Sequence, residues 1–133
     1  MTITIMHMNN QKIITLVDVV VVMDKEEILF NKIGDTLSKD YLHITKGKMM
    51  SAPGIKYKNK VFAFYYKKEV VFRLGEDFDP KEHNVKKCRL LNPFKNKAPM
   101  KNWFQIPYSE NRRWEKLAKE ALNVLKEELK SSK

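Results

Sequence analysis

The chain has little of the material from which common active sites are built. Its 133 residues include 4 glycines and 1 cysteine. A single cysteine, Cys88, excludes an intramolecular disulfide and fits a reducing compartment. The sequence has no G-x-S-x-G nucleophile elbow, no Walker loop and no glycine-rich dinucleotide fingerprint. We therefore expect a protein that is not an enzyme and needs no cofactor.

Metal-ligand spacing is missing as well. His7, His43 and His83 are far apart, with no C-x-x-C motif and no histidine pair at positions i and i+4. Cys88 lies in a predicted strand with no visible base beside it, which favours a buried thiol over a nucleophile. We predict no metal site and no catalytic residue.

Long apolar runs are also absent. The longest, Ile13 to Met23, has about 11 residues and is interrupted by Asp18, whereas a membrane-spanning helix needs roughly 20. It makes a poor signal peptide, because only Lys12 and His7 precede it and no small-x-small cleavage site follows. We expect a cytoplasmic protein that does not contact a membrane.

Positive charge is abundant and unevenly placed. The net charge is +10, and residues 43–113 hold 17 lysines and arginines against 6 carboxylates. Concentrated positive charge attracts polyanions such as nucleic acid or acidic proteins. The simpler interpretation is that lysines keep the edges and turns of a sheet soluble.

Residues 1–23 differ from the rest of the chain. Met1 to Asn10 has no usable period and is interpreted as a leader. Lys12 to Met23 has the composition of a strand, but its four consecutive valines need cover on both faces. This segment packs in the core, pairs with another chain, or lies outside the native domain. We predict one domain over residues 24–133, with residues 1–23 as an extension or extra strand.

Helices are predicted at both ends of this domain. Asp24 begins a capping box, and apolar residues then recur every fourth position, which predicts a helix over residues 25–38. Asp79-Pro80 predicts a short helix over residues 80–86. Ser109 caps a last helix, whose apolar residues recur at three and four positions: Trp114, Leu117, Ala118, Ala121, Leu122, Leu125 and Leu129.

Strand segments fill the middle of the chain. Tight basic turns are predicted at Lys58-Asn59 and Lys67-Lys68, with Asn59 able to take a positive φ. Strict alternation over residues 61–66 places Phe62, Phe64 and Tyr66 on one face and Val61, Ala63 and Tyr65 on the other. The expected strand segments are 43–50, 55–57, 61–66, 70–74, 88–91 and 103–106.

Two blocks of residues carry a resemblance to a known family. The first runs from Lys48-Met49-Met50 through Lys60-Val61-Phe62-Ala63 to Val71-Phe72-Arg73-Leu74, and the second is Pro99-Met100-Lys101-Asn102-Trp103. Together they resemble the TfoX N-terminal domain family, which is related to the MmcQ/YjbR-like small domains. The resemblance covers about residues 28–125. Ser51 and Asn59 stand where the family pattern has glycine.

The resemblance implies an α+β fold. It has an N-terminal helix, an antiparallel sheet of about five strands, a short middle helix and a C-terminal helix packed on the sheet. The family takes its name from a bacterial competence regulator, and a neighbouring family is commonly described as DNA-binding. The motif is structural and carries over no catalytic or binding residue, so the implied function is a small regulatory binding domain.

Six lysines in two basic segments are the candidate binding residues for nucleic acid or an acidic protein partner: Lys56, Lys58, Lys60, Lys95, Lys97 and Lys101. The alternative is a protein-interaction or self-assembly module, such as a homodimer, that pairs through a sheet edge or through Val19 to Val22 and has no nucleic-acid role.

Aromatic residues near these lysines suggest base stacking. Single-stranded nucleic-acid binders combine exposed rings with lysines. Tyr57 and Tyr65 are open to this interpretation. For Trp103 and Trp114 we favour packing together in the core, between the last strand and the last helix.

Overall fold

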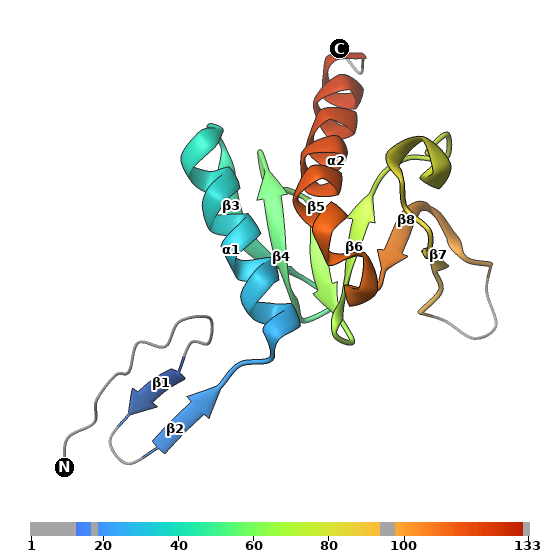
Figure 1. Cartoon of the computed structure of the whole chain (residues 1–133). Coiled ribbons are helices and arrows are strands. Elements are labelled where there is room, and N and C mark those ends of the chain that lie inside the picture. The colour runs from blue at the N-terminus through green and yellow to red at the C-terminus, as the bar shows by residue number, and fades with distance from the viewer. Residues whose placement is uncertain (1–12, 17–18, 94–97, 132–133) are drawn as a thin grey trace.

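The protein has an α+β fold built on a six-stranded antiparallel sheet (Figure 1). The computed structural model describes residues 13–16, 19–93 and 98–131. The spatial order of the strands is β3-β4-β5-β6-β8-β7. Their bounds are β3 Ile44–Met49, β4 Ala52–Tyr57, β5 Lys60–Tyr66, β6 Glu69–Arg73, β7 Arg89–Leu91 and β8 Met100–Ile106. Each predicted strand segment is confirmed, and the sheet has six strands where about five were expected.

Strand β4 begins three residues earlier than predicted and includes Pro53 and Gly54. Proline normally ends a central strand because it lacks an N–H donor. Here Pro53 pairs with Lys48 of β3, whereas the pairing of β4 with β5 extends only to Gly54 opposite Phe64. Pro53 therefore has a strand neighbour on one side only, where a missing donor is tolerated.

Two long helices lie on one face of the sheet (Figure 1). Helix α1 spans Lys25–Asp40 and α2 spans Asn111–Ser131. The predicted short middle helix begins at Pro80 as expected, with Asp79 as its N-cap, but it is a 3-10 segment, η1 (Pro80–His83), that ends three residues earlier than predicted, before Asn84 with φ 58°. The predicted cap at Ser109 is wrong, since that residue lies inside a second 3-10 segment, η2 (Tyr108–Glu110).

The N-terminal segment forms two short strands and not the single strand expected. Strands β1 (Ile13–Leu16) and β2 (Val19–Val22) pair antiparallel as a separate two-stranded sheet. The predicted leader, residues 1–10, lies outside the described residues. The domain boundary at residue 24 stays a prediction.

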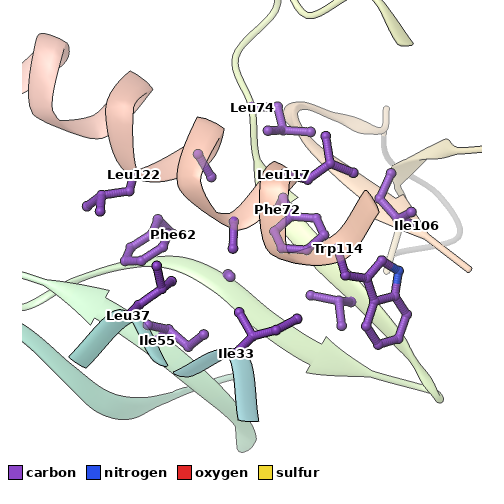
Figure 2. Close-up of a cluster of buried hydrophobic side chains, with 14 of the residues drawn as sticks. Ile33, Leu37, Ile55, Phe62, Phe72, Leu74, Ile106, Trp114, Leu117 and Leu122 are labelled. Atoms are coloured by element: carbon purple, nitrogen blue, oxygen red, sulfur yellow. The ribbon is translucent and has the colours of Figure 1, made fainter. Parts of the chain in front are cut away.

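The main core, which we call the helix-side core, lies between the sheet and the two helices (Figure 2). Its largest fully buried side chains include Leu37 of α1, Phe62 and Phe72 of the sheet, and Trp114 of α2. The Trp114 indole N–H also donates a hydrogen bond to the Pro107 carbonyl, at 3.2 Å. The apolar residues of α2, spaced three and four apart, thus bury one face of the helix against the sheet, as predicted.

A β-bulge in β5 overturns the predicted alternation. Ile55 pairs with Ala63, but the next residue, Lys56, pairs with Val61, so the register shifts around Phe62. A bulge places two consecutive residues on one face. Phe62, Ala63 and Tyr65 accordingly contact the helix-side core, whereas Val61, Phe64 and Tyr66 belong to a cluster on the other face, and the strict alternation is wrong.

The cluster on the other face, the far-side cluster, centres on four buried residues: Phe64, Val71, Leu91 and Trp103. The Phe64 and Trp103 rings have centroids 5.6 Å apart. Burial of both tryptophans is confirmed, but they do not pack together as predicted, because Trp103 lies in the far-side cluster and Trp114 in the helix-side core.

Three hairpin turns have positive φ at both central residues: Met50-Ser51, Lys58-Asn59 and Lys67-Lys68. This is typical of type I′ turns, which match the twist of the adjoining strands. The positive φ predicted for Asn59 is confirmed at 68°. Lysine and serine adopt this left-handed conformation only at a cost of about 1 to 2 kcal/mol.

Ser51→Gly should stabilise the protein by about 0.5 to 1 kcal/mol. Ser51 is exposed with φ 69°, so glycine relieves the left-handed strain while losing part of the gain to greater freedom of the unfolded chain. Urea unfolding measures the change, and Ser51→Ala, which keeps a Cβ, should show no gain. A lower free energy of unfolding for Ser51→Gly would contradict the strain.

Candidate anion-binding site

Four of the six predicted lysines lie in the described part of the chain, on three strands and one turn. Lys56 is on β4, Lys58 is in the β4–β5 turn, Lys60 begins β5, and Lys101 is on β8. Lys95 and Lys97 lie outside the described residues. The β4–β5 turn and the C-terminal end of α2 lie at the same end of the sheet (Figure 1). The predicted lysines are therefore joined there by lysines of the helix.

A hollow of about 330 Å³ lies between this turn and α2. Its lining residues are Tyr57, Lys58, Lys126, Leu129 and Lys130. We call Lys58, Lys126 and Lys130, together with Tyr57, the basic cluster. The three ammonium groups come from two elements far apart in sequence, and no carboxylate lines the hollow.

Tyrosine rings hold two of the lysines in place. The Lys126 ammonium lies 4.8 Å from the centroid of the Tyr41 ring and 5.6 Å from that of Tyr57. The Lys58 ammonium lies 5.5 Å from the Tyr57 centroid. Cation–π contacts orient an ammonium without neutralising its charge. Lys126 and Lys58 thus keep their charge available to an anion.

Ion pairs leave most of the cluster's charge uncompensated. Among the described residues, no carboxylate oxygen lies within 4.0 Å of the Lys58 or Lys126 ammonium. Lys130 does pair with Glu127 at 3.7 Å, but both side chains are about three-quarters exposed. Such pairs contribute little and exchange readily with another anion.

A structural role for these lysines explains only part of the cluster. Lys130 lies in the last turn of α2, where positive charge stabilises the carbonyl end of the helix dipole. Lys58 has no such role, because it belongs to a turn and has φ 49°. Lysine is not the residue that a type I′ turn prefers, so the turn gains no stability from it.

An acidic hollow on the other side of α2 limits where an anion can bind. It lies against the loop after β6, has a volume of about 450 Å³ and is lined by Glu76, Asp77, Asp79, Glu82, Glu120 and Glu128. Lys101 lines neither this hollow nor that of the basic cluster. Lys101 is on β8, separated from β5 by β6. We therefore do not include Lys101 in the basic cluster.

The two remaining predicted lysines lie near the cluster but outside its hollow. The stem of Lys56 crosses Gly47, since a Cβ added at Gly47 would lie 2.6 Å from Lys56 Cε. A larger residue at position 47 would displace the Lys56 side chain from this path. Lys60 lines a different cavity, described below.

Sequence patterns missed Lys126 and Lys130 because α2 also carries Glu127 and Glu128, a mixture typical of a solvated helix. The signal that could have identified these two lysines was their spacing along the helix. Residues 126 and 130 are four apart and share one side of the helix. Only the tertiary structure brings that side next to the β4–β5 turn.

The structure gives no support for base stacking by the tyrosines. Tyr65 packs against Phe30 with centroids 6.1 Å apart, and burial, helped by Asp24, raises its pKa to about 12. Tyr57 has the ammonium groups of Lys58 and Lys126 over its ring. A ligand near Tyr57 would therefore meet these two ammonium groups and not an open ring face.

The described residues hold no arrangement typical of a metal site, a reactive cysteine or a membrane-spanning helix. No group of three or more histidine, cysteine and carboxylate side chains is placed there to hold a metal ion. Burial raises the pKa of the Cys88 thiol, with a smaller contribution from Glu110, which lowers its reactivity. Neither helix of the described residues is long and apolar enough to cross a membrane.

Comparison with known proteins gave no match to a family model, a curated protein or a solved structure. The resemblance to the TfoX N-terminal domain family therefore stays a prediction, and the function is argued from the geometry of the site.

Proposed function

We propose that this chain is a non-catalytic binding domain that holds the phosphate backbone of nucleic acid at the basic cluster. The hollow lined by Lys58, Lys126 and Lys130 without a carboxylate carries this proposal. Lysine is a mobile point charge suited to phosphate. The net charge of +10 adds a long-range field that attracts polyanions.

The cluster favours the backbone over the bases. Its one lining aromatic ring, Tyr57, is already in contact with two ammonium groups, so bases have no free ring on which to stack. Phosphate contacts by themselves carry no sequence information. We expect binding that is largely independent of sequence and that accepts double strands.

Edge pairing, the alternative function, has less support. The two edges of the main sheet are β3 and β7. β3 carries Lys46 and Lys48, and lysines on an edge strand discourage pairing with another chain. β7 has only 3 residues, too few for a strong interface.

Binding of labelled DNA at two salt concentrations tests the proposal. With three phosphate contacts, the affinity for a 20-base-pair duplex should fall about forty-fold between 50 and 200 mM salt, and that for a single strand about twenty-fold. Fluorescence anisotropy of the full chain with each labelled DNA measures both values.

Two results would oppose the nucleic-acid proposal. The first is no binding at 50 mM salt, or binding that does not change with salt. The second is displacement of the DNA by polyglutamate at an equal or lower concentration of charge, which would assign the cluster to an acidic protein.

A further inference from the structure

A second cavity, of about 590 Å³, lies where the first residues of β5 and the last residue of β6 meet the end of α2. Its lining residues are Met49, Lys60, Val61, Arg73, Leu125, Glu128 and Leu129. The volume is within the range of small-molecule sites, about 300 to 1,000 Å³. The lining is mostly apolar, with three charged side chains.

The bulge at Phe62 accounts for this cavity. Pairing between β5 and β6 ends at Ala63 opposite Phe72, so residues 60–62 have no recorded partner in β6. The cavity lies at this break in the sheet. It is lined by Leu125 of the helix-side core and by Met49 and Val61 of the far-side cluster. The two apolar cores thus meet there.

The charges around the cavity indicate the ligand's head group. Arg73 donates a hydrogen bond to Glu128, which neutralises that pair. Lys60 is exposed and, among the described residues, has no carboxylate oxygen within 4.0 Å. One positive charge is therefore left over at an apolar cavity.

We propose that this cavity binds a small amphipathic carboxylate, with its apolar tail against Met49, Val61 and Leu125 and its carboxylate on Lys60. Inorganic phosphate would leave the apolar lining unfilled, and a neutral alcohol would leave Lys60 without a partner. The proposal does not rest on nucleic-acid binding, because none of the lysines of the basic cluster lines this cavity.

Calorimetric titration with octanoate tests the proposal. Octanoate should bind saturably at one site per chain and at least about ten-fold more tightly than octanol or octyltrimethylammonium, because of the three only the carboxylate can accept charge-assisted hydrogen bonds from the Lys60 ammonium. Lys60→Gln should weaken octanoate about ten-fold and leave octanol unchanged. Lys32→Gln, an exposed lysine of α1 outside both the cavity and the basic cluster, serves as the matched control and should bind octanoate normally.

Val61→Trp should abolish octanoate binding by filling the cavity. Loss of octanoate affinity with an unchanged free energy of unfolding would support the site. If this variant does not fold, the contrast between Lys60→Gln and Lys32→Gln decides. Absence of saturable binding, equal binding of the cationic analogue, or equal effects of the two lysine changes would overturn the proposal.

Discussion

Replacing Phe62 with alanine should lower the free energy of unfolding by about 3 to 5 kcal/mol, a large part of the total stability of a domain of this size. Phe62 is completely buried. The bulge directs its ring toward α2, where it packs in the helix-side core (Figure 2). Removing the ring leaves a cavity between the sheet and the helix that neighbouring side chains fill only in part.

Denaturant unfolding of Phe62→Ala and Phe62→Leu measures this effect, and leucine should cost much less than alanine because it retains most of the apolar volume. A double-mutant cycle that combines Phe62→Leu with Leu122→Ala tests the face of the sheet on which the Phe62 ring lies. Leu122 is in the same core, so a coupling of about 0.5 to 3 kcal/mol is expected. Leu91→Ala, in the far-side cluster, should be additive with Phe62→Leu. Coupling to Leu91 in place of Leu122 would contradict the bulge.

Local patterns in the sequence were sufficient for most of the fold. The 3-4 spacing in α2 and the apolar segments between turn residues identified both long helices and all six strands of the main sheet. The sequence did not predict the bulge in β5 because every residue from Val61 to Tyr66 is apolar. No alternation of polar and apolar residues marks which side chains face the core. Only the pairing of β5 with both neighbours fixes which residues face the helices.

The middle helix is shorter than predicted for a different reason. Asp79-Pro80 does start a turn, and the Asp79 carboxylate accepts a hydrogen bond from the Lys81 N–H. The left-handed conformation of Asn84 then ends it, with the Asn84 N–H directed at the Lys81 carbonyl. A cap predicts where a helix begins but not how far it extends.

The candidate site was predictable only in part. Lys58 was named as a candidate from its turn and lies in the basic cluster, and its role in binding stays a prediction. The place of Lys126 in the cluster depends on the position of α2 relative to the β4–β5 turn, which no local pattern encodes. The acidic hollow on the other side of α2 also depends on the tertiary structure, since it joins Glu76 and Asp77 to Glu120 and Glu128 of α2.

The double change Lys58→Gln and Lys126→Gln should weaken binding to duplex DNA about fifty-fold at 0.1 M salt. Each lysine that contacts a phosphate releases about 0.9 counterion, so losing two contacts removes nearly two powers of ten at this concentration. The fold should persist, because Lys58 is exposed and the cation–π contacts of Lys126 are worth about 1 kcal/mol.

The most direct test compares this double variant with a control double variant, Lys32→Gln plus Lys116→Gln, by anisotropy with the same duplex. Lys32 and Lys116 are exposed on α1 and α2 and lie outside the basic cluster. Each double variant loses two positive charges, so only the place of the loss differs. Binding at the basic cluster predicts about a fifty-fold loss for the first variant and only a few-fold loss for the second. Equal losses in the two variants, or no loss in the first, would contradict it.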